Sequence, residues 1–174
     1  MAAERGLVGA EGWFSGGERL PYDPERVNFD DGAPLRVFVR HATGGGTTQT
    51  FLPGWPDGSF GWAKVEAELA GRSDAARLFL DYVGHGDSDK PREHPYSTYE
   101  RADLVEALWR ARSVGETVVI AFDYSCIVTL ELLARRLERQ RAGEDPGTQI
   151  RACLLANVAC SPTATHTHGS RRRC

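Results

Sequence analysis

TVVIAFDYSCIVTLELLARRLERQRA, residues 117–142, passes from an apolar run directly into a long helical pattern. Residues 117–122, apolar from Val118 onward, have the pattern of an unbroken strand buried on both faces of a parallel sheet. Residues 126–142 carry apolar side chains first and basic ones at the C-terminal end, the charge arrangement that a helix dipole favours. The stretch therefore predicts a buried strand that turns sharply into a helix.

Such a turn holds one side chain at its apex and leaves room only for small residues two positions before and after it. With Asp123 at the apex, these flanks are Ala121 and Ser125, which are both small. With Ser125 at the apex, the flanks are Asp123 and Ile127, which are too large. We therefore expect Asp123 at the apex and keep Ser125 as the alternative. A carboxylate is ionised at pH 7 and can attack carbon without a general base. A structural alternative stays open, in which either residue only caps the helix.

Strands and helices alternate on both sides of this turn. Residue patterns predict strands at 26–30, 35–41, 47–53, 77–83 and 150–156, and helices at 59–71 and 97–111, the latter opened by a Ser97–Glu100 capping box. The turn at 31–34 has hairpin composition, so the first two strands are expected to pair. The predicted fold class is α/β, with an N-terminal hairpin, then parallel strands with helices on both faces, ending after the sixth strand. Residues 1–25 are expected to form a loose leader, 26–157 the domain and 158–174 an irregular tail.

Composition and charge exclude several function classes. The chain has 174 residues, 41% of them apolar, and a net charge of −3, which gives no electrostatic reason to expect nucleic acid or a membrane surface as partner. No apolar run approaches the roughly 18–20 residues that span a bilayer, and no export signal is evident, so a cytoplasmic location is expected. The basic run 171–173 is expected to be a solvated tail. The four cysteines, Cys126, Cys153, Cys160 and Cys174, lack CxxC spacing and are expected to be free thiols. With His166 and His168, the last two cysteines have no zinc signature.

Three segments resemble the α/β-hydrolase family over about residues 20–157. LPGWPDGSFGW (52–62) is similar to the His-Gly-x-Pro segment after the third strand of these enzymes, and DYVGHGDSDKP (81–91) to the loop after their fourth strand. AFDYS (121–125) resembles the nucleophile elbow of the haloalkane dehalogenase, epoxide hydrolase and mesoderm-specific-transcript-like branch.

The resemblance implies a nucleophilic Asp123 and an oxyanion hole made by the backbone N–H groups of Trp55 and Tyr124. It also implies that the side chains of these two residues could hold a leaving halide. The expected substrate is a small-molecule halide, epoxide or ester, with no metal or organic cofactor. A serine esterase that uses Ser125, and a non-catalytic binding protein of the same fold, are the alternatives.

The chain departs from the family pattern at three positions: Pro53 and Phe122 each replace a histidine, and Ser125 replaces a glycine. The family's catalytic histidine follows an eighth strand, whereas the only histidines after the elbow here are His166 and His168, for which a role as base is not expected. Periodicity is lost after residue 157, which favours a truncated or frameshifted hydrolase that is inactive or limited to a single turnover. Strand 150–156 would then be an exposed apolar edge, which predicts self-association.

Overall fold

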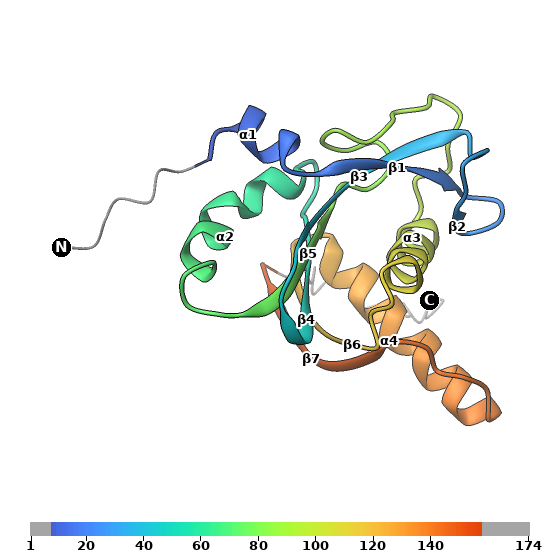
Figure 1. Ribbon diagram of the computed structural model, residues 1–174. Coiled ribbons are helices and arrows are strands. Elements are labelled where there is room, and N and C mark those ends of the chain that lie inside the picture. The colour runs from blue at the N-terminus through green and yellow to red at the C-terminus, as the bar shows by residue number, and fades with distance from the viewer. Residues whose placement is uncertain (1–7, 158–174) are drawn as a thin grey trace, which may run out of the picture.

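The computed structural model describes residues 8–157, which form one mixed sheet of seven strands in the order β2-β1-β3-β5-β4-β6-β7 (Figure 1). The strands are β1 (Glu18–Asp23), β2 (Asn28–Phe29), β3 (Leu35–Ala42), β4 (Gly45–Leu52), β5 (Ala75–Leu80), β6 (Glu116–Phe122) and β7 (Gln149–Ala156). The helices are α1 (Ala10–Ser15), the 3-10 turn η1 (Ser59–Trp62), α2 (Ala63–Leu69), α3 (Thr98–Ala111) and α4 (Ser125–Ala142). β4, β5, β6 and β7 run parallel, so the predicted α/β class is confirmed.

The pairing at the N-terminal edge differs from the predicted hairpin. β2 does not pair with β3; both pair antiparallel with β1, which lies between them. Tyr22 of β1 faces Phe29 on one side and Leu35 on the other. The predicted hairpin is wrong because β1 occupies the place between the two strands. The sequence of β1, ERLPYD, has two charged residues at its start and a proline in the middle, which hide the alternation.

Residues 10–23 are not the loose leader that the sequence predicts, because they form α1 and β1. Trp13 is only 1% exposed. Its ring makes an edge contact with Phe79 at 5.1 Å between centroids, and its indole N–H donates to Ser59 Oγ at 3.1 Å. One buried aromatic residue fixes such a segment without producing any sequence period. The predicted tail, 158–174, lies outside the described residues, as do Cys160, His166, His168 and Cys174.

Helices cover the two faces of the sheet, α1 and α2 on one and α3 and α4 on the other (Figure 1). Beneath α3 and α4 lies the larger apolar cluster, whose helical members include Leu104, Leu108, Val128 and Leu132. A smaller aromatic cluster of Trp13, Phe38, Phe51 and Phe79 with Ala63 lies on the other face. β7 ends the strand order, and its Leu154 is 60% exposed, so self-association through this strand remains a prediction. Within residues 8–157, no helix combines the length and apolar character needed to cross a membrane.

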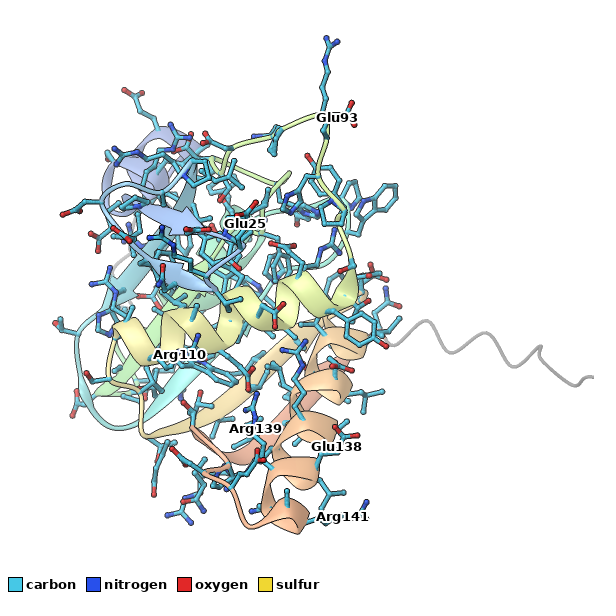
Figure 2. All side chains as sticks on the ribbon, turned by 90° about the vertical axis from the view of Figure 1, so that its right-hand side faces the viewer. Glu25, Glu93, Arg110, Glu138, Arg139 and Arg141 are labelled. Carbon is cyan, nitrogen blue, oxygen red and sulfur yellow. The ribbon has the colours of Figure 1, made fainter. Side chains whose placement is uncertain are left out.

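α4 lies beside α3, with Arg139 on the side of α4 that faces it (Figure 2), and ion pairs join the two helices. Arg139 Nη1 lies 2.5 Å from Glu106 Oε1, and Arg135 contacts Glu106 at 3.2 Å and Asp103 at 2.5 Å. Burial raises the pKa of Glu106, but the hydrogen bonds and charges of the two arginines outweigh it, so the pKa lies below its ordinary value. These pairs hold the C-terminal half of α4 against the middle of α3.

The first turn of α3 contains a buried acid. Ser97 Oγ accepts a hydrogen bond from the Glu100 amide at 3.1 Å, as the capping pattern predicts. The Glu100 carboxylate has no hydrogen-bond partner among the described residues, and its Oε1 lies 3.4 Å from His94 Nε2 without hydrogen-bond geometry. Burial raises the pKa of Glu100 to about 7 and lowers that of His94, so burial favours the neutral form of both groups.

Glu100→Gln should therefore stabilise the protein at alkaline pH. Because the folded pKa lies above the ordinary value of 4.5, the stability linked to Glu100 is fully present below that value and is lost as the pH rises through about 7. We expect the substitution to raise the free energy of unfolding by about 1–3 kcal/mol at pH 8 and by less at pH 5. Denaturant unfolding at both pH values measures this, with the exposed Glu138→Gln as control. An equal effect of Glu100→Gln at both pH values would contradict the expectation.

Candidate active site

The turn between β6 and α4 places Asp123 at its apex. Asp123 has φ of 52°, in the left-handed region that non-glycine residues seldom occupy and that costs free energy. Its amide donates to Ala156 O at 2.9 Å, which extends the β6–β7 ladder, and its carbonyl accepts from the Cys126 amide at 3.0 Å, which opens α4. The flanking Ala121 and Ser125 are fully buried. The strained backbone is thus confined to one residue between strand and helix.

Ser125 lies beneath the turn. It is 0% exposed, and its Oγ contacts both the Pro53 carbonyl and Tyr82 Oη, the latter at 2.9 Å. A carbonyl only accepts, so the single Ser125 proton goes to Pro53 O and the Tyr82 hydroxyl donates to Ser125 Oγ. Burial raises the pKa of Tyr82, which keeps this donor protonated. Where the family pattern has glycine, Ser125 thus ties the elbow to the start of the loop after β4.

The loop after β4 passes close to Asp123. A Cβ on Gly54 would lie 2.7 Å from the Phe122 ring and 3.0 Å from Asp123 Cβ, so only glycine permits this approach. As a result, the Trp55 amide donates to Asp123 Oδ2 at 3.2 Å. The Trp55 side chain is 65% exposed. The structure therefore brings together two of the predicted site groups, the Asp123 carboxylate and the Trp55 amide.

The side chain of Tyr124 turns toward α3. Its hydroxyl shares a hydrogen bond of 2.6 Å with Thr98 Oγ1, and the Arg101 guanidinium lies 4.4 Å from its ring centroid. The hydroxyl that would be needed for a halide is thus engaged by Thr98, and halide binding by Trp55 and Tyr124 remains a prediction. The Tyr124 amide lies at the N-cap of α4, where backbone donors and the helix dipole favour negative charge.

Asp81 joins the two loops that frame the site, a role that the sequence did not reveal. Its carboxylate is buried and accepts from the Ser59 amide at 2.5 Å and the Asp87 amide at 2.7 Å. Gly86 has φ of 46°, and a Cβ there would lie 1.9 Å from Asp81 Oδ2, which explains the glycine of the DYVGHGDSDKP motif. Burial raises the pKa of Asp81 above its ordinary value, although the two hydrogen bonds act to lower it.

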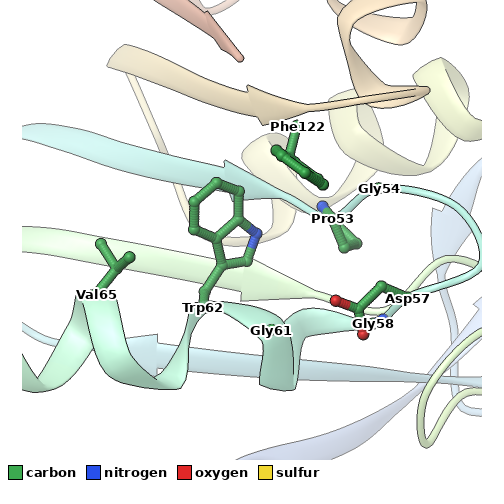
Figure 3. A pocket seen from close by; sticks show the side chains of 8 residues that line it. All are labelled: Pro53, Gly54, Asp57, Gly58, Gly61, Trp62, Val65 and Phe122. Atoms are coloured by element: carbon green, nitrogen blue, oxygen red, sulfur yellow. Dashed lines mark hydrogen bonds between the residues drawn. The ribbon is translucent and has the colours of Figure 1, made fainter. Parts of the chain in front are cut away.

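Beside the loop lies a cavity of about 290 Å³, between the ends of β4 and β6 and the helix α2 (Figure 3). Trp62 and Phe122 form its aromatic walls, with an edge contact at 6.4 Å, and the Asp57 carboxylate is its charged group. Phe122, which replaces a histidine of the family pattern, therefore contributes an apolar wall to this cavity.

None of the three described histidines contacts Asp123 through a hydrogen bond. Each lies elsewhere in the sheet or contacts other residues. His41 lies in β3, separated from β6 by β5 and β4. The ring of His85 lies between the Asp57 carbonyl and Arg101, and His94 lies against Glu100. Among residues 8–157, therefore, no histidine is hydrogen-bonded to Asp123.

A sheet of this order with a strained strand–helix elbow defines an α/β-hydrolase fold. The family model described as "Alpha/beta hydrolase family" matches residues 51–172, and the chain belongs to that family. LipZ of Mycobacterium tuberculosis is 40% identical over 126 residues, which are 72% of this chain and 39% of LipZ. The human mesoderm-specific transcript homolog protein is 32% identical over 157 residues, 86% of this chain and 42% of that protein.

A haloalkane dehalogenase of Sphingobium indicum is 32% identical over 103 residues, 55% of this chain and 33% of the enzyme. Among solved structures, an esterase from Exiguobacterium antarcticum matches with a TM-score of 0.64 and 18% identity, covering 83% of this chain and 46% of the esterase. At that identity the likeness shows the fold alone. The chain spans about 40% of the length of the first curated relatives that it matches.

Proposed function

We propose that this chain carries the nucleophile of a hydrolase that acts at carbon through a covalent ester on Asp123. The observation that carries the proposal is the Trp55 amide, which donates to Asp123 Oδ2 at 3.2 Å while the strained backbone holds Asp123 at the apex of the elbow. The substrate class is an alkyl halide, an epoxide or an ester. The relative described as a haloalkane dehalogenase supports the first of these classes.

The chemistry follows from which oxygen the amide holds. Asp123 Oδ1, the oxygen not bound by Trp55, attacks the substrate carbon, and the carbon–halogen bond breaks with its electron pair leaving on the halide. For an epoxide, the ring C–O bond breaks instead, and the alkoxide takes a proton from water. The product of either attack is an ester of the Asp123 carboxyl group. With an ester substrate, attack on the acyl carbon expels the alkoxide, which takes a proton from water, and leaves a mixed anhydride on Asp123.

During hydrolysis of this ester, the oxyanion forms on the Asp123 carboxyl group itself and not on the substrate. Water adds to Asp123 Cγ and loses a proton, so negative charge develops on Oδ2, the oxygen that already accepts from the Trp55 amide. Collapse breaks the Cγ–Oδ1 bond, the alcohol leaves with that oxygen, and the carboxylate is restored. A donor that is in place before charge develops is worth several kcal/mol to the transition state. The Tyr124 amide is proposed as the second donor.

Hydrolysis requires activation of water by a base, and within residues 8–157 no histidine forms a hydrogen bond with Asp123. We therefore expect the 174-residue chain alone to form the ester once and to accumulate it. The serine esterase alternative is disfavoured because Ser125 is buried and bonded to Pro53 and Tyr82. The non-catalytic alternative differs from the proposal in predicting no adduct.

Two probes test the proposal on the whole chain. A primary alkyl bromide should add one alkyl mass that hydroxylamine removes, because hydroxylamine cleaves esters and leaves thioethers on the cysteines intact. A fluorophosphonate, which labels activated serines, should add nothing. Labelling by the fluorophosphonate would favour the Ser125 esterase, and the absence of any hydroxylamine-sensitive adduct would contradict a competent nucleophile in this chain.

A further inference from the structure

The loop that carries Trp55 is held at both ends by side chains of other elements. At its start, the Pro53 carbonyl accepts from Ser125 Oγ beneath the elbow. At its end, the Asp57 carbonyl lies 2.7 Å from His85 Nδ1. Between these two points the Trp55 amide meets Asp123 Oδ2. The position of that amide therefore depends on both attachments.

The contacts of His85 determine its protonation state. Arg101 Nη2 lies 3.1 Å from His85 Nε2. A guanidinium has only donors, so Nε2 must be the unprotonated acceptor. The ring proton then lies on Nδ1 and is donated to the Asp57 carbonyl. His85 is thus a neutral Nδ1–H tautomer, and it bridges the loop to α3.

Arg101 extends this bridge to the elbow. Its guanidinium lies 4.4 Å from the Tyr124 ring centroid and 5.2 Å from that of Tyr82, whose hydroxyl donates to Ser125. A continuous set of contacts therefore runs from Asp57 through His85 and Arg101 to Tyr124. One end of this set belongs to the loop that supplies the Trp55 amide, and the other to the turn that supplies the Tyr124 amide. These amides are the two proposed oxyanion donors.

We infer that His85 is a positioning residue whose neutral ring holds the Trp55 loop against the elbow, and that protonation of this ring releases the loop. The inference rests on the proposed role of Asp123 for its catalytic consequence. The positional consequence, which is the dependence of the Trp55 amide on His85, stands apart from any reaction.

The surroundings of His85 favour the neutral ring. Burial lowers its pKa, the hydrogen bond to Asp57 raises it, Arg101 lowers it, and the charges of Asp81 and Lys90 act in opposite directions, raising and lowering it. Tyr82 packs edge-on against the ring at 5.9 Å.

The net pKa of His85 lies below the ordinary value of 6.5. The stabilisation is therefore present above pH 6.5, and it is lost as the pH falls from there through the lower folded pKa. The protonated ring would direct Nε2–H at the Arg101 guanidinium, which offers no acceptor, and the two cations repel. This repulsion moves the ring, and with it the Asp57 carbonyl that the ring holds, whereas the neutral Asn side chain introduces no such repulsion.

Two substitutions separate the two contacts of the ring. The Asn amide in His85→Asn offers an N–H donor near the position of Nδ1 and does not titrate. The longer Gln amide in His85→Gln offers an oxygen near the position of Nε2, which keeps the acceptor for Arg101 and loses the donor to Asp57. His41→Asn, on the exposed residue of β3, is the matched control.

Two quantities are followed from pH 5 to 8 in each protein. One is the rate of alkyl bromide adduct formation at Asp123, and the other is the NMR chemical shift of the Trp55 backbone amide. We expect His85→Gln to slow adduct formation about tenfold, because a displaced Trp55 amide no longer orients the Asp123 carboxylate with Oδ1 toward the substrate. His85→Asn should stay within about twofold of the unsubstituted chain and lose the acid-side change in the Trp55 resonance. The unsubstituted chain and His41→Asn should keep that change.

If the chain forms no adduct, the Trp55 amide resonance alone decides whether His85 positions the loop. A failure of the proposed function can therefore be told apart from a failure of this inference. A Trp55 resonance that does not follow the titration of His85 would overturn the inference. A nitrogen spectrum of labelled imidazole that shows the proton on Nε2 at pH 8 would overturn it as well, because the Asp57 contact would then have no donor.

Discussion

Asp123→Asn should reduce the rate of ester formation with an alkyl bromide by about a thousandfold or more, to the background of the solution reaction. The substitution removes the ionised oxygen that attacks carbon and leaves a neutral amide, which is a poor nucleophile. Intact-mass measurement of hydroxylamine-sensitive adduct over time gives the rate. The Trp55 amide can still donate to the Asn oxygen, so the loss would report on the nucleophile rather than on the loop.

The fold should survive this substitution. Asn occupies the left-handed region more readily than most residues, and Asp123 has φ of 52°. The free energy of unfolding should therefore change by less than about 1 kcal/mol. Asp74→Asn, in the exposed turn before β5, is the control for removing one carboxylate. Undiminished adduct formation in Asp123→Asn would contradict a nucleophilic role for Asp123.

Asp81→Ala should produce the largest loss of stability among these variants, about 3–5 kcal/mol in the free energy of unfolding. The substitution leaves the buried Ser59 amide and the part-buried Asp87 amide without the carboxylate that accepts from both. Asp81→Asn, which keeps one acceptor oxygen, should lose less. Urea unfolding measures both, with the exposed Asp74→Ala as control. A loss below about 1 kcal/mol in Asp81→Ala would show that the two loops hold their places without this carboxylate.

The parts of the fold that depend on near neighbours could be predicted from the sequence. The apolar run 117–122 and the helical pattern after it identify β6 and α4, and Ser97 with its cap identifies the start of α3. β1 and the order β2-β1-β3 could not be predicted, because pairing depends on contacts such as that of Tyr22 with both Phe29 and Leu35. The one buried residue of α1, Trp13, is fixed by Phe79 of the distant strand β5, and a single buried residue leaves no period to detect.

In the candidate site, too, features set by near neighbours in the chain could be predicted, and features set by distant contacts could not. The small residues around Asp123 point to the apex because crowding at a sharp turn acts over two positions of the chain. The partners of His85, by contrast, lie 28 residues before it, at Asp57, and 16 residues after it, at Arg101. A single histidine in a glycine-rich loop gives no sign of such partners, nor does one aspartate predict that it will join two loops. These roles emerge only when the loops are folded together.

Residue-level mapping of the alkyl adduct on the full chain tests the role of Asp123 most directly. The chain is incubated with excess alkyl bromide, digested, and the modified peptide is fragmented to locate the added mass. We predict one alkyl group per chain as a hydroxylamine-sensitive ester on the carboxylate of Asp123, accumulating without sustained release of alcohol. A modified Ser125, or alkylation confined to hydroxylamine-stable thioethers on the cysteines, would contradict it.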